Sequence, residues 1–298
     1  VLVPVANPNT EDNLLRLALI LAKTSQGTLL PLHILSDRQE AISPAQKMQQ
    51  TQLLRAAETV ANAANCAVEP IARIDDAIDR GILRSATERE ASLIVCGWKG
   101  FSTTRDNFFG SIIDNIVRRS PVPVLISRFP DPIQNTARIV LAVTDSELTR
   151  LGFQETVDIA KSLAEDLKAT LQVLLVAKKR ELNNKNEAEV EILSEITVNR
   201  VQGNFVRLVS QNLLEHDLLI LTTTYQQQNL WEQPGTLKEP ASIARTHTPR
   251  CFDACCLFSY ILRNILSAGD AMNLHSPAVE IRCESQEIMM TSCAPFPG

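Results

Sequence analysis

The sequence predicts an α/β protein with two tandem open parallel sheets, each of five strands with helices on both faces. The first observation is an alternation of short apolar runs with longer segments of helical periodicity, which is typical of parallel sheets with helical crossovers. The second is the run "SLIVCG" at 92–97, whose nearly unbroken apolar character fits a strand covered on both faces. The third is that the pattern occurs twice along the chain.

The first half is expected to contribute five strands and four helices. Thr10 is placed to cap the first helix and Gly27 to end it. Pro44 is tolerated at the start of the second helix, and Arg118 and Arg119 complement the dipole in the last turn of the fourth. The strands are expected at 1–6, 28–34, 67–74, 92–97 and 121–127, and the later helices at 43–65, 75–91 and 111–120.

The second half repeats this order imperfectly. The run "HDLLILTTTY" at 216–225 mirrors "ASLIVCGWKG" at 91–100 with an offset of 125 residues, and the same offset carries Gly110-Ser111 onto Gly235-Thr236. Strands are also expected at 137–145 and 169–177, with a helix over about 146–167. We therefore expect a first domain at 1–129, a linker at 130–136, a second domain at 137–258, and a tail of unassigned structure at 259–298.

Composition narrows the class of protein. The net charge of −5 argues against a nucleic-acid binder, and no apolar run approaches the ~18 residues of a membrane span. Because the chain begins at Val1 inside an apolar run, we expect a piece of a longer protein. Seven cysteines without a C-x-x-C pair favour reduced, cytoplasmic thiols. The cysteines at 251, 255 and 256, with His247, match no structural zinc spacing, so no metal cluster is expected.

Glycine is concentrated after the fourth expected strand, although the whole chain has only ten glycines. Gly97, Gly100 and Gly110-Ser111 give the pattern G-x2-G-x9-G-S, which runs from the end of a strand into a helix. Glycines allow backbone N–H groups to approach phosphate oxygens, and a helix N-terminus attracts anions. Lys99 and Arg105 lie between these glycines and could offset phosphate charge. A dinucleotide fingerprint and a P-loop both require other glycine positions, so we exclude them.

This motif resembles the ATP-binding motif G-2x-G-9x-G-(S/T) of the universal stress protein (UspA) family. Three further runs resemble the same family: the opening "VLVPVANP", "LPLHI" in the second expected strand and "SPVPVLI" at the fifth. The resemblance is good over residues 1–128 and weak over 137–258. The resemblance implies an adenine nucleotide alpha hydrolase-like fold and a site for ATP or AMP, with Mg²⁺ accompanying the phosphates. It places the nucleotide against Val5, Ala6, Ile34, Cys96, Gly97, Gly100, Gly110, Ser111 and Ile112.

Both repeats depart from the family pattern. Ala6, followed by Asn7, stands where the family usually has an acidic residue closing the first strand. In the second repeat Asp145 keeps that acid, but bulky Tyr225 replaces Gly100. We expect the second repeat to be a degenerate, structural partner.

The opening segment most resembles stress-protein domains that follow the membrane part of bacterial cation:proton antiporters. This implies a nucleotide-binding regulatory module at the cytosolic face of the membrane, with the transporter upstream in the same polypeptide and homo-oligomers formed through sheet edges. No catalytic residue is identified, and a non-catalytic protein is expected. The alternatives are a ligand-free dimerisation module and a stand-alone tandem stress protein with weak ATPase activity.

Simpler interpretations remain for several residues. The glycines could serve only as a flexible crossover loop. His33 near a strand end is expected to be a hydrogen-bonded structural residue. The carboxylates Asp75, Asp76 and Asp79 are expected in the first turn of a helix, where they complement its dipole.

Overall fold

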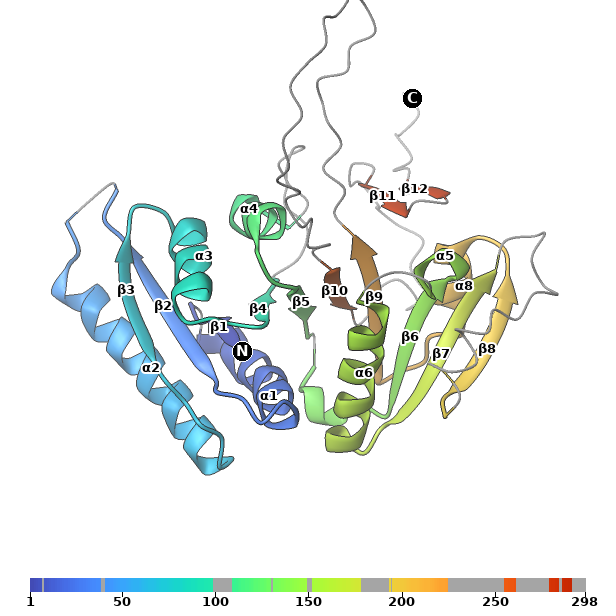
Figure 1. Cartoon of the computed structure of the whole chain (residues 1–298), viewed down its shortest axis with the longest axis horizontal. Coiled ribbons are helices and arrows are strands. Elements are labelled where there is room, and N and C mark those ends of the chain that lie inside the picture. The colour runs from blue at the N-terminus through green and yellow to red at the C-terminus, as the bar shows by residue number, and fades with distance from the viewer. Residues whose placement is uncertain are drawn as a thin grey trace, which may run out of the picture.

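A computed structural model describes residues 1–6, 8–38, 41–98, 109–129, 131–148, 152–177, 193, 195–224, 255–260, 279–283 and 286–290. Within these residues one ten-stranded sheet runs in the order β3-β2-β1-β4-β5-β10-β9-β6-β7-β8 (Figure 1). It consists of a five-stranded and a four-stranded parallel sheet joined by β10, so the predicted fold class is confirmed.

The first sheet has its strands in the order expected of a doubly wound fold, with β1 at its centre. Its strands are β1 (Leu2–Pro4), β2 (Leu30–Ser36), β3 (Ile71–Asp75), β4 (Ile94–Gly97) and β5 (Val124–Arg128). Its helices are α1 (Pro8–Thr24), α2 (Pro44–Ala63), α3 (Ile78–Glu88) and α4 (Ser111–Arg119).

The helix boundaries of the first half follow local sequence signals. Helix α1 begins before Thr10, two residues earlier than the predicted cap. Helix α2 begins with a capping box, in which the Ser43 side chain accepts from the Gln46 N–H and the Gln46 side chain accepts from the Ser43 N–H. Helix α4 begins directly after Gly110, as predicted, and ends on two arginines that complement its dipole.

The second sheet differs from the prediction in its last strand. It has four parallel strands, and β10 lies beside β9 but runs antiparallel to it. Its four parallel strands are β6 (Arg138–Thr144), β7 (Thr170–Ala177), β8 (Thr197–Gln202) and β9 (Asp217–Thr224). Strand β10 (Cys255–Tyr260) pairs with both β9 and β5. The helices of the second half are α5 (Asp145–Leu148), α6 (Phe153–Leu167) and α8 (Phe205–Asn212), and η1 (Ile133–Asn135) precedes them.

The expected tail contains structure that the sequence did not indicate. Strand β10 crosses the proposed boundary at 258, and β11 (Val279–Cys283) and β12 (Gln286–Met290) form an antiparallel hairpin further on. The single helix expected over 146–167 is two helices, α5 and α6, with Gly152 in a left-handed conformation just before α6.

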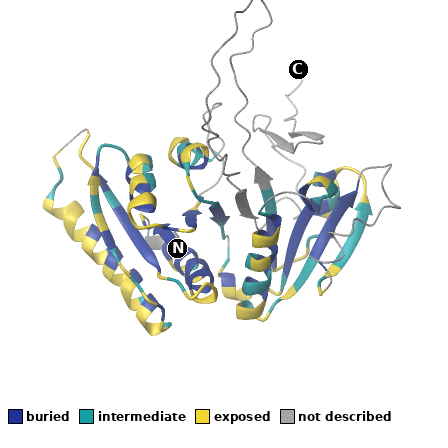
Figure 2. Ribbon diagram, viewed as in Figure 1, coloured by how far each residue is buried: buried dark blue, intermediate teal, exposed yellow. Residues whose placement is uncertain are grey.

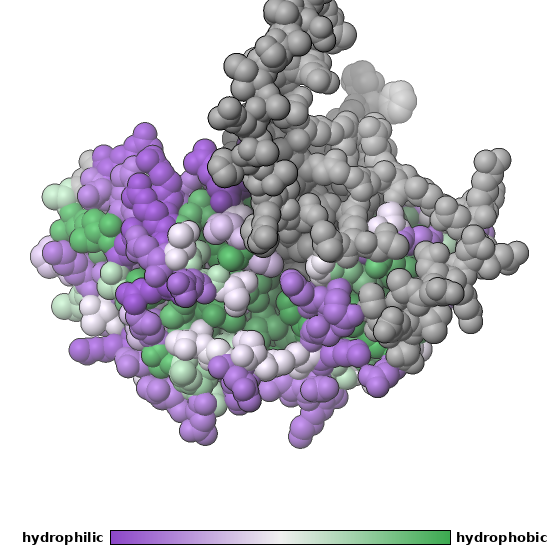
Figure 3. All heavy atoms as spheres, in the orientation of Figure 1, coloured by the Kyte–Doolittle hydropathy of each residue, from purple (hydrophilic) through white to green (hydrophobic). Residues whose placement is uncertain are grey.

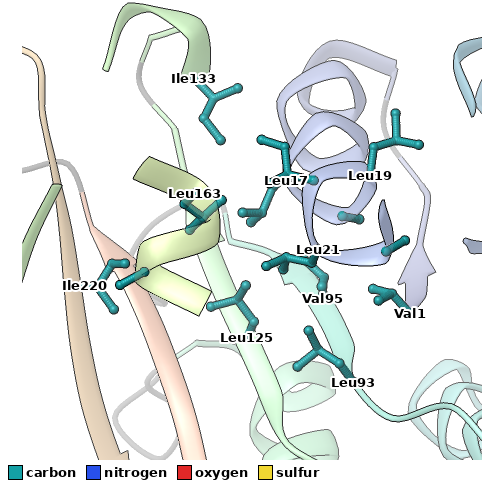
Figure 4. Packing of buried hydrophobic residues seen from close by; sticks show 14 of the residues in the cluster. Val1, Leu17, Leu19, Leu21, Leu93, Val95, Leu125, Ile133, Leu163 and Ile220 are labelled. Atoms are coloured by element: carbon teal, nitrogen blue, oxygen red, sulfur yellow. The ribbon is translucent and has the colours of Figure 1, made fainter. Parts of the chain in front are cut away.

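Two helix layers cover the sheet. Helices α1, α2 and α6 pack on one face over a cluster that includes residues of both halves, whereas α3 and α4 pack on the other face of the first half. Helix α1 contacts α6, and Leu17 and Leu21 of α1 gather with Leu163 of α6 and Ile133 of η1 (Figure 4). The two halves therefore share one hydrophobic cluster on this face, and each has a cluster of its own on the other.

Exposure follows this layering. The strands β2, β6 and β7 are mainly buried, and the outward face of α2 is exposed (Figure 2). The flank beside α2 and α3 is mainly hydrophilic, and hydrophobic atoms show near the centre of the same view (Figure 3). Among the described residues no helix has the length and apolar character needed to cross a membrane.

The prediction that Asp75, Asp76 and Asp79 all lie in the first turn of a helix is wrong. Asp75 is the last residue of β3 rather than a first-turn helix residue, and only Asp79 occupies that turn. The buried Asp75 carboxylate accepts from Arg73 Nε at 3.0 Å and from an Arg84 guanidinium N–H at 2.7 Å. Burial raises the pKa of Asp75, but hydrogen bonding with Asp76, Arg73 and Arg84 outweighs burial and lowers it to about 2. Asp75 thus holds β3 to α3.

Candidate functional site

The candidate site lies at the carboxyl ends of β1 and β4. From β1 the chain continues to β2 and β3 on one side, whereas β4 and β5 lie on the other, so strand order reverses between β1 and β4. Open parallel sheets bind ligands at this switch point, outside the carboxyl ends of the strands. Pairing of Leu2 with Ile94 and of Pro4 with Leu32 fixes the register there.

That register sets four of the nine predicted residues, Val5, Ala6, Ile34 and Gly97, near one another. Extended beyond the paired residues, the β1–β2 register sets Ala6 level with Ile34. The β1–β4 register, extended in the same way, sets Val5 level with Gly97 and Ala6 level with Trp98. Ala6 and Gly97 are exposed, and Ile34 is partly exposed. Strand β2 continues to Ser36, so Ile34 lies inside the strand rather than at its end. Its side chain contacts the α3 face, beside Gly81.

Val5 is held by its neighbours. Its side chain is buried, its N–H donates to the Leu32 carbonyl at 2.8 Å, and its carbonyl is 2.6 Å from His33 Nδ1. Because a carbonyl only accepts, Nδ1 carries the proton. His33 is therefore the hydrogen-bonded structural residue that was predicted, and its carbonyl accepts from Gln50 Nε2 at 2.8 Å.

Gly97 and Gly110, the two glycines of the motif that the structure describes, differ in why the position holds glycine. A methyl group built on Gly97 would lie 3.4 Å from Leu14 Cδ2, an ordinary contact, so packing does not require glycine there. Gly110 has φ +99°, a conformation that favours glycine, and its position as N-cap leaves no side chain to cap α4. Gly97 has no side chain to cover the exposed backbone at the end of β4. Gly110 has no side chain to cap the first N–H groups of α4.

The residues at the start of α4 are accessible. Ser111 and Ile112 are exposed, and the carboxylate of Asp114, one turn into the helix, accepts from the Phe109 N–H at 3.2 Å. The first N–H groups of an α-helix lack intrahelical partners and carry the positive end of the dipole. Gly100, Lys99 and Arg105 lie outside the residues that the structure describes.

An aromatic contact joins the two ends of the motif. The rings of Trp98 and Phe109 meet edge to face with centroids 5.0 Å apart, and Arg128 of β5 lies 6.0 Å from the Trp98 ring centroid. Trp98 follows Gly97 directly, and Phe109 precedes Gly110 directly. The contact therefore brings the exposed edge at Gly97 towards the N-terminus of α4. Neither ring was given a role from the sequence, although their positions beside the glycines were a usable signal.

Cys96 is buried beneath this edge. Burial raises the pKa of the Cys96 thiol to about 12, so it is neutral at physiological pH and unsuited to act as a nucleophile. Among the described residues no group of three or more histidine, cysteine, aspartate or glutamate side chains could hold a metal ion. His247 and Cys251 lie outside those residues.

In the second repeat the side chain of Glu147 occupies the corresponding edge of the sheet. The buried Glu147 carboxylate accepts from the Thr144 N–H at 2.6 Å, from Thr144 Oγ1 at 3.0 Å and from Thr222 Oγ1 at 3.1 Å. Thr222 of β9 stands at the position of Gly97, 125 residues later. From the sequence the loss of this site was attributed to Tyr225, which lies outside the described residues, and Glu147 was missed.

Comparison with known proteins agrees with this geometry. Residues 1–128 match the Universal stress protein family. The Na(+)/H(+) antiporter NhaS5 of Synechocystis sp. is 30% identical over 147 residues, which cover 48% of this chain and 21% of the antiporter. The match therefore spans about a fifth of the antiporter's length.

One solved structure is similar in fold over most of its length, and a second was also matched. A functionally unknown protein from Pseudomonas aeruginosa PAO1 is 18% identical with a TM-score of 0.52, over 71% of this chain and 77% of that chain. The universal stress protein from Archaeoglobus fulgidus in complex with dAMP is 18% identical with a TM-score of 0.37, over 42% of this chain and 94% of that chain.

The parallel sheet and its switch point define an open, doubly wound α/β fold. Residues 1–128 are similar to the Universal stress protein family over the whole of the first sheet and its helices.

Proposed function

We propose that residues 1–129 bind an adenine nucleotide, ATP or AMP, as a regulatory ligand rather than as a substrate. The observation that carries this proposal is Gly97, an exposed glycine at the switch point whose lack of a side chain is not required by packing. The Trp98–Phe109 contact brings this edge towards the start of α4, where Ser111 and Ile112 are exposed.

The residues present suit the parts of such a ligand. The N-terminal N–H groups of α4 and the Ser111 hydroxyl donate hydrogen bonds to phosphate oxygens, and Mg²⁺ would accompany a triphosphate. Adenine would lie at the level of Ala6 and Ile34, where the end of β1 leaves the edge of β2 accessible. The neutral Cys96 thiol beneath the site favours binding over covalent catalysis.

The test is the nucleotide content of the purified chain. The protein is denatured with acid, and the released nucleotides are separated by chromatography and quantified against protein. Adenine nucleotide approaching one per chain, lost in Gly97→Thr, is the expected result. Protein that carries no nucleotide and binds none when ATP or AMP is added would contradict the proposal.

A ligand-free structural module is the second candidate, because Ala6 lacks a carboxylate at the end of β1 and Glu147 fills the second site. In this case the wild-type protein would carry no nucleotide, and Gly97→Thr would leave dimer formation unchanged. Weak ATPase activity is a third candidate, which slow phosphate release that vanishes in Gly110→Val would support.

We further propose that this nucleotide site controls a cation:proton antiporter from the cytosolic face of the membrane. The similarity to NhaS5 supports this placement, although it covers only 21% of that protein. A nucleotide that binds one transport state more tightly shifts the equilibrium towards that state. Self-association would use the outer strands β3 and β8, because β10 covers the inner edges at β5 and β9.

Vesicles containing the antiporter relative, with its matching segment replaced by this chain, test the transport proposal. Added ATP or AMP is expected to change the Na⁺/H⁺ exchange rate, and the Gly97→Thr version is expected to respond to neither. Equal rates with and without nucleotide would contradict it.

A further inference from the structure

Glu11, in the first turn of α1, is a buried acidic residue. It is 7% exposed, and its Oε1 atom has no hydrogen-bond partner among the described residues. Burial raises the pKa of this carboxyl group. An unsatisfied buried carboxyl costs stability, and native structures rarely keep one without a reason.

The helix places Glu11 at the switch point. Helix α1 packs over β1 and β4, and Leu14, Leu15 and Ala18 share the buried stripe of Glu11 at helical spacing. Leu14 lies against the Cβ position of Gly97. Because α1 begins at the carboxyl end of β1, Glu11 lies one turn beyond Gly97, over the candidate site. Side chains also lean towards the helix N-terminus, which directs this carboxyl towards the same place.

The second repeat shows that the fold does not need an acid there. The buried stripe of α1 recurs in α6 with an offset of 142 residues, and this offset carries Glu11 onto Phe153. Phe153 is 3% exposed. The matching buried residues are Leu14, Leu15, Ala18, Leu21 and Ala22 in α1 and Thr156, Val157, Ala160, Leu163 and Ala164 in α6.

The second repeat has a buried carboxylate of its own at the carboxyl end of its first strand, although it comes from α5 and not from the position of Glu11. Glu147 accepts from the hydroxyls of Thr144 and Thr222. The strand registers set Thr144 at the position of Ala6, so Asp145 matches Asn7 and the expectation that Asp145 keeps the acid of that position is wrong. The positions equivalent to Thr144 and Thr222 are thus Ala6 and Gly97, which have no hydroxyl. The first repeat therefore has a buried acid without the hydroxyl donors that satisfy the acid of the second.

We propose that the sugar hydroxyls of a bound ribonucleotide supply these donors, and that Glu11 makes the first repeat selective for ribose over deoxyribose. This inference rests on the proposed function, because it assumes a nucleotide in the same site. A carboxylate repels phosphate, so Glu11 suits the neutral part of the ligand. The two vicinal hydroxyls of ribose lie between the base and the phosphates and are uncharged hydrogen-bond donors. Glu11 also compensates for the acid that is absent at Ala6.

Calorimetric titration of the full chain with ATP, 2′-deoxyATP and 3′-deoxyATP tests this. The wild-type protein is expected to bind ATP about tenfold more tightly than 2′-deoxyATP, as the loss of one charge-assisted hydrogen bond implies. Glu11→Leu is expected to bind all three with equal, weakened affinity, and Glu11→Gln to show a reduced preference. Glu147→Gln, in the second repeat, is the matched control and is expected to keep the wild-type preference.

Thermal unfolding without nucleotide separates this role from a structural one. Glu11→Leu removes a buried carboxyl group whose Oε1 atom has no partner among the described residues, and is expected to unfold at the same or a higher temperature than the wild type. Wild-type protein that binds ATP and 2′-deoxyATP equally, or a Glu11→Leu variant that keeps the preference, would overturn the role of Glu11 alone. Wild-type protein that binds no nucleotide would overturn the proposed function as well.

Discussion

The rings of Trp98 and Phe109 lie edge to face with their centroids 5.0 Å apart, and they join the strand side of the glycine motif to its helix side. Trp98 is 6% exposed and packs in the cluster beneath α3 and α4. Gly97 and Gly110 are 13 positions apart in the sequence. The contact between the two rings brings both glycines into one site.

Replacing Trp98 with alanine is expected to weaken both stability and nucleotide binding. Truncation of a large buried aromatic side chain typically costs about 3–5 kcal/mol. Urea unfolding measures the stability loss, and calorimetry measures ATP affinity. Trp98→Phe keeps a ring at this position and is expected to retain most of both properties. An alanine variant that is folded and binds ATP normally would show that the ring contact does not organise the site.

Removing the Glu147 carboxylate tests the closed second site. Glu147→Ala breaks hydrogen bonds to Thr144 and Thr222, and is expected to cost on the order of 2 kcal/mol in the free energy of unfolding. The wild-type protein is expected to bind one nucleotide per chain, in the first repeat. Two equivalent sites in a titration of wild-type protein would contradict this interpretation of Glu147.

Asp75 is expected to make stability depend on acid pH. Its pKa is lowered in the folded protein to about 2 from an ordinary value of 3.8, so its contribution is complete above the ordinary value. The contribution is lost as the pH falls through the folded pKa. Asp75→Asn is expected to cost on the order of 2 kcal/mol at neutral pH, and this difference is expected to shrink in acid.

Urea unfolding at several pH values measures this difference. Asp12→Asn is the control, because Asp12 forms an exposed pair with Arg16 on α1 that should contribute little. A gap between wild type and Asp75→Asn that stays constant down to the lowest pH would argue against the ionic cluster.

Cys96 is expected to be chemically inert while the protein is folded. Its thiol is buried and its pKa is raised to about 12, so almost no thiolate exists at physiological pH. Iodoacetamide treatment followed by peptide mass spectrometry should find Cys96 unmodified in native protein and alkylated after unfolding in urea. Rapid labelling of Cys96 in native protein would reveal an accessible, ionised thiol instead.

Much of the first half could be predicted because local signals and burial agree there. Ser43 caps α2 through its own side chain, and Gly110 precedes α4 in the conformation that the motif requires. By contrast, strand β8 (Thr197–Gln202) was not predicted, because half-buried polar residues give it no clear apolar pattern. The antiparallel course of β10 depends on pairing with β5 and β9, which periodicity cannot indicate.

The site was predicted less completely than the fold. The glycine spacing pointed to the end of β4, but Asp75 was assigned to a helix because its partners, Arg73 and Arg84, meet it only in three dimensions. Glu11 was not singled out, although its spacing to Leu14 already placed it on the buried stripe. Glu147 could not have been found without the pairing that brings Thr222 beside it.

Titration of ATP and AMP into the wild-type chain, Gly97→Thr and Thr222→Val tests the central claim most directly. Gly97→Thr copies the second repeat into the first, and Thr222→Val alters the matching position of the second repeat. Thermal unfolding confirms that each variant is folded. We predict one nucleotide per chain for the wild type and Thr222→Val, and no binding for Gly97→Thr. Equal affinity in all three proteins, or no binding in the wild type, would contradict a nucleotide site at the carboxyl ends of β1 and β4.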